Sequence, residues 1–408
     1  MTDFVPNNKQ LSHSVCRPFL DYTRQELREL FQRAGFPLYR VDQVRRWVFA
    51  RKTDSFTQMT DISKEHRQRL AEMFAGGLRL GSSGVISGKI SDFTAVSGSR
   101  PVSGVSNNTV SSSKITDSAA GSDSVFIGKE VTRTGSPDGT EKLLIEWPDG
   151  HRVESVLLRD DRQHRTACIS TQVGCAMGCL FCASGMDGFI RNLSRAELLE
   201  QFLRLNSLLP ENERLTHLVV MGTGEPTLNL PNLLSALEEI TAGDGFDLGN
   251  RRVTISSVGI PEGIKKLAAA NVPYKLAISL HAPNDEIRDR IIPQNRRHPI
   301  AEVLDAADQY FQATGRRVTF EYILIDGLND SREHALQLAG RIQRKTAVVN
   351  LIPCNPVPEL PFKAPPVSRI HQFVNTLEQQ GIQVKIRFRK GNDISAACGQ
   401  LRRGFKSE

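Results

Sequence analysis

Three of the seven cysteines lie close together, at Cys175, Cys179 and Cys182 in the segment GCAMGCLFCASG. Thiolates at this spacing can bind three irons of a four-iron, four-sulfur cluster and leave the fourth iron open. An open iron can chelate the amino and carboxylate groups of S-adenosylmethionine and pass an electron to its sulfonium. Homolysis then yields a 5′-deoxyadenosyl radical, which abstracts hydrogen. We therefore predict one [4Fe-4S] cluster and S-adenosylmethionine at this segment.

A zinc site and a chance grouping of buried thiols are the alternatives for these cysteines. Structural zinc is almost always four-coordinate, and no fourth Cys or His follows shortly after Cys182. Phe181 favours the iron–sulfur interpretation, because an aromatic ring directly before the last cysteine can shield a cluster. Cys16 and Cys354 fit neither site, and we interpret them as structural or incidental.

Glycine and polar residues follow later segments that have the character of β-strands. In MGTGEPTLN, the glycines allow close backbone approach, and the carboxylate of Glu225 can receive an ammonium group. The candidates at strand ends are Gly224, Glu225, Ser256, Ser279, Leu280, His281 and Asn355. Each is a weak signal alone, because turns and helix caps use the same residue types. Together they predict one cofactor pocket.

Strands and helices alternate from about residue 165 onward. The predicted strands cover 167–171, 216–221, 252–256, 274–280, 317–324 and 348–352, with a last one at 385–388. The predicted amphipathic helices cover 194–208, 230–241, 261–269, 301–314, 331–345 and 368–380. Six β-then-α units indicate an α/β fold with a parallel sheet, and we predict an open, partial (β/α)6 barrel. Ligands of such sheets bind at the carboxyl ends of the strands.

Three smaller parts precede this core, which we place at 161–408. Residues 1–80 are predicted to form a small helical domain that docks RNA, and 81–124 a flexible insertion rich in serine and glycine. Residues 125–160 are predicted to form a short β extension. Its strands are expected at 124–133, 142–148 and 153–158.

The net charge of +7 suits a polyanionic partner. Over 17–80, thirteen Lys and Arg oppose eight Asp and Glu. Basic residues also flank the tail segment that contains Cys398, namely Lys385, Arg387, Arg389, Lys390, Arg402, Arg403 and Lys406. Phosphate contacts are one interpretation of these groups, and a solvated surface is the other. With no secretory signal and no apolar run that could cross a membrane, we predict a cytoplasmic protein without membrane contact.

The cysteine segment, MGTGEPTLN, AISLHAPNDEIR, NLIPCNPVP and RKGNDISAACGQLRRG together resemble the radical S-adenosylmethionine superfamily. More narrowly, the chain is similar to its ribosomal RNA adenine-C2 methyltransferases, over nearly its whole length apart from 81–124 and the extreme ends. The resemblance implies a radical S-adenosylmethionine barrel that methylates adenosine 2503 of 23S rRNA and adenosine 37 of tRNA. It also implies two S-adenosylmethionine molecules per turnover and a reducing electron donor such as flavodoxin. We expect a monomer, because a large RNA needs an open active-site face.

The resemblance assigns three reaction roles. Cys398 matches the family's cysteine that accepts and carries a methyl group, which is needed because carbon 2 of adenine has no nucleophilic lone pair. After hydrogen abstraction from the S-methyl group, the methylene radical adds to the base. Cys168 matches the cysteine that releases this adduct through a transient disulfide with Cys398, and Glu154 matches the catalytic base. Family contacts to the cofactor match Gly224, Glu225, Ser256 and Asn355.

Three other functions stay open at this point. A branch of the family that methylates carbon 8 shares all these motifs, so no single residue decides between the two carbons. A non-catalytic RNA-binding paralogue would need none of the cysteines, and a radical enzyme that modifies another protein would need no basic helical domain. The sequence departs from the family at Thr223, where methionine is more frequent, and in the insertion over 81–124.

Overall fold

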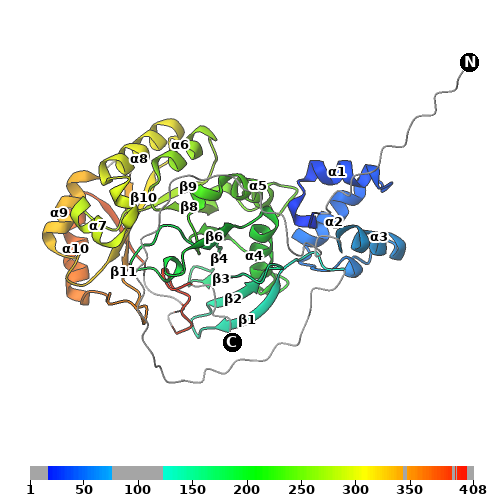
Figure 1. The fold of residues 1–408 in the computed structure, drawn as a ribbon, viewed down its shortest axis with the longest axis horizontal. Helices are drawn as coiled ribbons and strands as arrows, with labels where there is room; N and C mark the ends of the chain where they lie inside the picture. Colours follow the sequence, from blue (N-terminus) through cyan, green and yellow to red (C-terminus); the bar gives the residue numbers. More distant parts are fainter. Residues whose placement is uncertain (1–16, 76–122, 343–346, 388–390, 392, 402–408) are drawn as a thin grey trace, which may run out of the picture.

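The computed structural model describes residues 17–75, 123–342, 347–387, 391 and 393–401. Figure 1 shows a central sheet with helices along its outer side and a separate group of helices at one end. Most of the predicted insertion lies outside the described residues, as do Cys16, Arg389, Lys390 and the basic residues after 401. None of the described helices is long and apolar enough to cross a membrane.

One ten-stranded sheet has the order β1-β2-β3-β4-β7-β8-β9-β10-β11-β12. Its parallel part consists of β4 (Arg165–Cys168), β7 (His217–Val220), β8 (Val253–Ser257), β9 (Lys275–Ser279), β10 (Val318–Leu324), β11 (Ala347–Pro353) and β12 (Gln383–Ile386). The connecting helices are α4 (Arg195–Ser207), α5 (Leu230–Thr241), α6 (Pro261–Ala269), the short α7 (Asp285–Ile291), α8 (Ile300–Thr314), α9 (Arg332–Arg341) and α10 (Val367–Gln379). The six β-then-α units confirm the predicted partial barrel.

The β extension continues this sheet. Its strands are β1 (Lys129–Gly135), β2 (Glu141–Glu146) and β3 (Arg152–Arg159), which pair in antiparallel fashion. β3 also pairs with β4, so that Val156 lies opposite Cys168. The extension therefore supplies one side wall of the barrel and brings a third antiparallel strand next to the first parallel one.

Three boundaries differ from the prediction. The strand expected over 124–133 begins at Lys129, because the preceding segment is bound to the helical domain, where Ser124 bridges with Ser55. The strand expected over 167–171 ends at Cys168, and an unpredicted hairpin of β5 (Gln172–Gly174) and β6 (Phe189–Asn192) follows it. The helix expected over 331–345 ends at Arg341 within the described residues.

The described residues of the C-terminal segment, Gly391 and 393–401, contact the turn between β1 and β2. The amide of Gly391 donates to Asp138 Oδ2 at 2.8 Å, and Ser136 Oγ donates to Asp393 Oδ1 at 2.7 Å. Farther along, the amide of Ala183 donates to the Gly399 carbonyl at 2.7 Å. These contacts hold the segment that carries Cys398 between the β extension and the cysteine loop.

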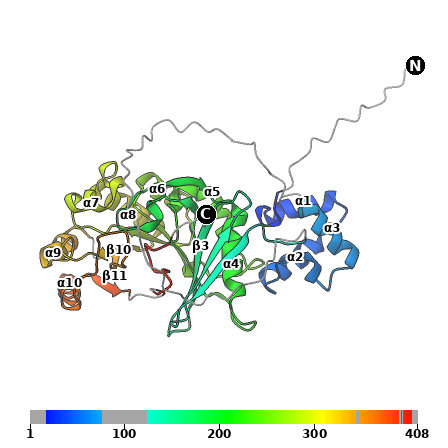
Figure 2. The ribbon, with the colours of Figure 1, turned by 60° about the horizontal axis from the view of Figure 1, so that its bottom comes forward.

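The helical domain comprises η1 (Phe19–Asp21), α1 (Arg24–Arg33), α2 (Tyr39–Phe49), η2 (Phe56–Gln58) and α3 (Lys64–Ala75). It packs around Phe56, whose ring centroid lies 5.8 Å from that of Phe19 and 5.5 Å from that of Phe74. Figures 1 and 2 both place this domain beside α4, at one end of the sheet.

Buried charges join the helical domain to the barrel. Glu239 of α5 forms ion pairs with Arg195 of α4, at 2.8 Å, and with Arg45 of α2. All three side chains are less than one-tenth exposed. Arg195 also donates to the Tyr22 carbonyl at 3.0 Å, so one cluster holds four segments together.

We expect Glu239→Ala to lower the free energy of unfolding by about 3–5 kcal/mol, because it leaves two buried guanidinium groups without their carboxylate. Denaturant titration of the purified protein measures this change. The matched control is Glu238→Ala, which removes the neighbouring exposed carboxylate and should change stability little. Equal effects of the two substitutions would contradict the assigned role of the cluster.

Candidate active site

The connection between β5 and β6 carries Cys175, Cys179 and Cys182. The amide of Cys175 donates to the Gly188 carbonyl at 2.9 Å, which closes the base of this cysteine loop. Glycine is required at Gly174, because its φ is +75° and a Cβ there would lie 1.9 Å from the Gly188 oxygen. The hairpin thus fixes the loop at the carboxyl ends of the barrel strands.

The three thiols are partly buried and pack against apolar side chains that include Met177 and Phe181. Burial raises the pKa of Cys175 to about 12 and also raises the pKa of Cys179 and of Cys182. The three cysteines would therefore need bound metal ions to be stable as thiolates at neutral pH. In the described ranges no three His, Cys, Asp or Glu side chains converge on a single ion. A four-iron cluster needs no such convergence, because each thiolate binds a different iron.

His281 and Phe181 form a wall beside the cysteines. Their rings pack edge to face with centroids 4.9 Å apart, and His281 Nδ1 accepts the amide hydrogen of Ile323 at 3.0 Å. Burial, with a contribution from the nearby Arg288, lowers the pKa of His281 to about 3. The ring is therefore neutral at physiological pH and acts in this wall as a packed, oriented polar group.

The turn after β7 carries the predicted glycine and carboxylate. Gly224 has φ +111°, and a Cβ there would lie 2.7 Å from Gln172, so only glycine fits. Glu225 is buried, with Oε2 accepting from the Val258 amide at 2.8 Å and Oε1 accepting from Thr227 Oγ1 at 2.6 Å. Oε1 also accepts the Thr227 amide hydrogen at 3.1 Å, which uses both of its lone pairs, so an ammonium group would bind at Oε2.

These residues line a cavity of about 160 Å³ together with strand-end side chains. Its predicted members are Cys175, Cys179, Cys182, Gly224, Glu225, Ser256, Ser279 and His281. Leu280 differs, because its side chain is fully buried in the main core and does not line this cavity. Its carbonyl accepts from Arg288 Nε at 3.1 Å, so Leu280 contributes backbone there.

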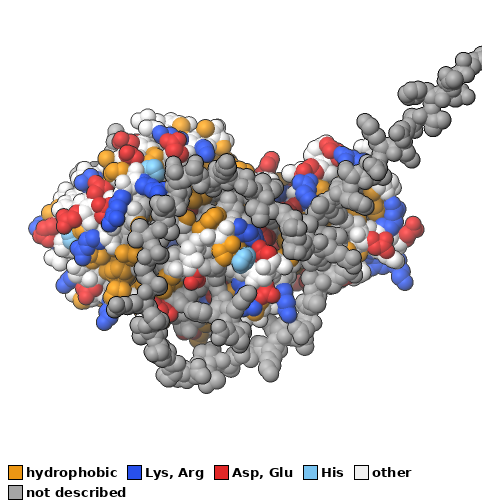
Figure 3. Space-filling model, in the orientation of Figure 1, with side chains coloured by type: hydrophobic (Ala, Val, Ile, Leu, Met, Phe, Trp, Pro, Cys, Tyr) orange, Lys and Arg blue, Asp and Glu red, His pale blue; other side chains and the backbone are white. Residues whose placement is uncertain are grey.

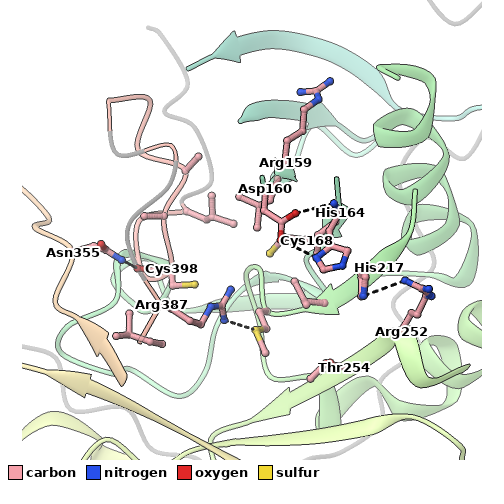
Figure 4. A pocket seen from close by; sticks show the side chains of 18 residues that line it. Arg159, Asp160, His164, Cys168, His217, Arg252, Thr254, Asn355, Arg387 and Cys398 are labelled. Carbon is pink, nitrogen blue, oxygen red and sulfur yellow. Dashed lines mark hydrogen bonds and ion pairs between the residues drawn. The ribbon is translucent and has the colours of Figure 1, made fainter. Parts of the chain in front are cut away.

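A second cavity, of about 400 Å³, lies inside the barrel and is drawn in Figure 4. Cys168, buried at the end of β4, and Cys398, exposed on the C-terminal segment, both line it. Cys398 also lines the first cavity, as do Met221, Ile352 and Arg387. Cys398 therefore stands where the two cavities meet.

Arg387 is the cation that faces both sulfurs. Its pKa is raised first of all by Cys398, with Glu321 and Cys168 contributing, and its Nη1 lies 3.6 Å from Met221 Sδ. Burial, with a contribution from the neighbouring Cys398, raises the pKa of Cys168 to about 12, although Arg387 opposes the rise. Arg387 thus stabilises negative charge on either sulfur.

Two buried oxygens in the cavity walls have no hydrogen-bond partner. One is Asn355 Oδ1, whose amide nitrogen donates to the Cys398 carbonyl at 3.0 Å, and the other is Glu321 Oε2. Buried polar atoms of this kind normally have a partner. Glu321 lines the cysteine cavity, where Oε2 can accept from a polar ligand, and Arg387 Nη1 lies 3.9 Å from this oxygen. Asn355 lines the barrel cavity rather than the cysteine cavity.

Glu154 is buried, which overturns the solvent-facing position that its strand alone suggests. Its carboxylate pairs with Lys142 Nζ at 2.8 Å, and Lys142 also donates to the Ser395 carbonyl at 3.3 Å. Alternation along β3 places Glu154 on the same face as Val156, which packs against Cys168 and the C-terminal segment. Glu154 therefore lies on the face of β3 that packs against the C-terminal segment, although it lines neither of the two cavities.

Sequence reasoning missed two buried charged residues, namely Glu321, which lines the cysteine cavity, and Arg288, which lines neither cavity. Arg288 is fully buried and donates to the carbonyls of Leu280 and Val258, which ties two strand ends together. Glu321 was hidden inside an apolar strand pattern. The sequence did contain a signal for Glu321, because a charged residue inside a predicted buried strand needs a polar or charged partner.

Two family models match the chain. The radical SAM superfamily matches residues 169–339, and the ribosomal RNA large subunit methyltransferase N-terminal domain matches 18–75. Relatives named “Probable dual-specificity RNA methyltransferase RlmN” include one from Rhodopirellula baltica, 44% identical over 94% of this chain and 90% of its own length. Another, from Desulforamulus reducens, is 39% identical over 95% of this chain and 96% of its own length. Among solved structures, a radical SAM methyltransferase from Sphaerobacter thermophilus matches with TM-score 0.80 and 36% identity, covering 95% of this chain and 99% of that one.

Proposed function

The chain belongs to the RlmN family of dual-specificity RNA methyltransferases in the radical S-adenosylmethionine superfamily, and from this premise we propose that it methylates carbon 2 of adenine. The proposed substrates are adenosine 2503 of 23S rRNA and adenosine 37 of tRNA. The superfamily uses a [4Fe-4S] cluster and S-adenosylmethionine. Cys175, Cys179 and Cys182 are the proposed ligands of the cluster, and the 160 Å³ cavity is the proposed cofactor site.

The position of Cys398 between the two cavities is the observation that carries this proposal. A side chain that carries a methyl group must reach the cofactor and the RNA base in turn. Cys398 is exposed, lies on a segment that bridges the barrel opening, and follows Ala396 and Ala397, whose small side chains leave room for a substrate. The bound cofactor supplies a methyl group for the Cys398 sulfur and, from a second molecule, a hydrogen-abstracting radical.

The other residues then act on the adduct between Cys398 and the base. Glu154 accepts the proton from carbon 2. Cys168 gives up its proton and attacks the Cys398 sulfur as the bond between that sulfur and the methylene carbon breaks. The two sulfurs end as a disulfide. The methylene carbon keeps the electron pair of the broken bond and takes up a proton, which makes it the methyl group on adenine. The unpaired electron leaves to a one-electron carrier, and thiols reduce the disulfide. Arg387 supports the attack because it faces both sulfurs.

Methylation of carbon 8 is the second candidate, because it would use the same residues. The test is anaerobic incubation of the reconstituted protein with S-adenosylmethionine, a reductant and unmodified rRNA or tRNA, followed by mass spectrometry of the nucleosides. We expect 2-methyladenosine. Finding 8-methyladenosine would assign the protein to the other branch, and cofactor cleavage without any methyladenosine would favour a protein substrate. A flavodoxin-like donor, a monomeric state and a cytoplasmic location stay predictions.

We expect Glu154→Gln to slow formation of methylated nucleoside by about 10²–10⁴-fold, the usual contribution of a positioned base. The substitution keeps the shape of the side chain and an oxygen for Lys142. Single-turnover assays at saturating RNA measure the rate. The matched control is Glu146→Gln on β2, which removes the charge of a carboxylate paired with Arg152 at 2.6 Å and should leave the rate unchanged. An unaffected Glu154→Gln enzyme would remove Glu154 from the reaction.

A further inference from the structure

The barrel cavity has a polar end opposite Cys398. In Figure 4, Cys398, Arg387 and Asn355 lie on one side of the cavity, and His217 and Arg252 lie on the other. Three neighbouring strands line this cavity with every second side chain. The lining residues are His164, Thr166 and Cys168 along β4, His217, Val219 and Met221 along β7, and Arg252 and Thr254 along β8, where His164 and Arg252 lie just before their strands and Met221 just after its strand. Each row therefore starts with a basic or imidazole group at the amino end of its strand.

The pairing register places His217 and Arg252 at one level. Thr166 pairs with His217, and Cys168 pairs with Val219, which in turn pairs with Thr254. His217 and Arg252 consequently lie one side-chain step, about 7 Å, below the level of Cys168. His164 lies a further step toward the amino ends.

The two imidazoles are held in fixed positions. Their ring centroids are 4.4 Å apart, and His164 Nδ1 lies 2.8 Å from Asp160 Oδ2. His217 Nδ1 lies 3.0 Å from Thr216 Oγ1, and Arg252 Nη1 lies 3.5 Å from His217 Nε2. Arg252 has five N–H donors, and only one of them is directed at His217, so the others can bind a ligand.

Positive charge gathers at this end without matching acids. Lys275 begins β9 and aligns with Thr254, and Lys385 lies on β12. Burial lowers the pKa of Lys275, and repulsion from Lys385 and Arg252 lowers it further, so both cations lie within electrostatic reach of Lys275. Of the three, only Arg252 lines the cavity, and Lys275 lies next to its lining residue Thr254. Among the described residues, Arg252, Lys275 and Lys385 form no ion pair. Asp160 is already engaged by His164 and by the backbone amides of Arg162 and His164.

This end differs from the general surface of the molecule. On the face shown in Figure 3, Lys and Arg side chains are interspersed with Asp and Glu over the helical layers. Unpaired like charges around a cavity destabilise the free protein, and a bound anion relieves that cost. The cavity, with a volume of about 400 Å³, has apolar walls between its two ends that include Val219, Ile352 and Leu401. Apolar walls suit a base, and the cationic end suits the phosphate groups that adjoin each nucleoside of a polynucleotide.

We propose that Arg252 and Lys275, with His164 and His217, bind the phosphodiester next to the target adenosine. This inference rests on the proposed function. A base with its reacting carbon at Cys398 directs its sugar and phosphate toward this end. RNA thus enters the barrel at the amino ends of the strands, whereas the cofactor cavity occupies the carboxyl ends, where ligands of such barrels ordinarily bind. The two reactants reach Cys398 from opposite sides.

The test uses the reconstituted holoenzyme and a stem-loop RNA that contains the target adenosine. We expect Arg252→Ala and Lys275→Ala each to weaken RNA binding about tenfold or more, as loss of a charge-assisted contact does. The salt dependence of binding should fall by about one phosphate contact per substitution. The matched control is Lys266→Ala, an exposed lysine on the outer helix α6, which should leave binding unchanged.

RNA with a neutral methylphosphonate on the 5′ or 3′ side of the adenosine identifies the contacted phosphate. At one of these positions the methylphosphonate should weaken binding in the unchanged protein, and Arg252→Ala should add little to that loss. The subsite would be overturned if, at both positions, the losses caused by the methylphosphonate and by Arg252→Ala were fully additive. It would also be overturned if Arg252→Ala and Lys275→Ala weakened binding no more than Lys266→Ala does. Failure of the proposed function is distinguishable, because the unchanged protein would then yield no methyladenosine from any RNA.

Discussion

Replacement of Cys168 by alanine is expected to stop turnover and to leave the protein covalently joined to its RNA. The adduct between the Cys398 sulfur and the adenine carbon would still form, because Cys168 takes no part in loading the methyl group or in the addition. Release requires a second thiol that attacks the Cys398 sulfur. Cys168 lines the barrel cavity with Cys398, and the described part of the chain places no other cysteine in that cavity.

Denaturing electrophoresis with labelled RNA measures the adduct as a slower band. The double variant Cys168→Ala, Cys398→Ala should give no such band, because it lacks the carrier sulfur. Cys354→Ala is the matched control: it removes another buried thiol, one that packs near the cysteine loop and outside the barrel cavity, and should turn over normally. Multiple turnovers by Cys168→Ala without an adduct would exclude Cys168 as the releasing thiol.

The surroundings of Cys168 explain why its reaction must await the adduct. With a pKa raised to about 12, Cys168 is a neutral thiol at physiological pH, and a neutral thiol is a poor nucleophile. The apo protein is thereby protected from premature disulfide formation. Arg387 opposes the rise in pKa and lies in the same cavity, so it lowers the cost of removing the proton when attack occurs.

The sequence predicted the barrel well because each unit has its own local signals. α4 begins with a capping box at Ser194 and Glu197, and α5 begins with proline in its first turn, so both starts can be read from nearby residues. The hairpin β5–β6 could not be predicted in this way. Its formation depends on the close approach of the Gly188 carbonyl to Gly174, a contact between residues that local patterns treat as a loop.

The sequence predicted those parts of the candidate site that require particular residue types. It did not predict the parts that depend on how distant segments are positioned in the fold. The cysteine spacing and the glycine turn at Gly224 are visible in the sequence, because few other residues fit there. The burial of Glu154 depends on Lys142 and on the return of the chain at Ser395, about 240 residues away in sequence. The row formed by His164, His217 and Arg252 likewise exists only through strand register, which residue spacing within one strand does not reveal.

Cys179→Ser is expected to abolish the cluster and with it all methylation, although the fold should persist. Serine has nearly the same shape, but its oxygen is a hard ligand that stays protonated at neutral pH, so it cannot replace a thiolate on iron. The cysteine loop packs in an apolar cluster separate from the main core of the sheet, so the substitution leaves the core contacts intact. Cys175→Ser and Cys182→Ser should also abolish the cluster and methylation.

Iron and sulfide content, visible absorbance and formation of 5′-deoxyadenosine measure this loss after anaerobic reconstitution. All four should fall to background in Cys179→Ser, whereas thermal unfolding should resemble that of the unchanged protein. Cys354→Ser is the matched control, since Cys354 is buried in the same apolar cluster and lies outside the proposed ligand set. A full cluster in Cys179→Ser would reject that ligand set, and stoichiometric zinc without iron in the unchanged protein would replace the radical chemistry by a structural metal site.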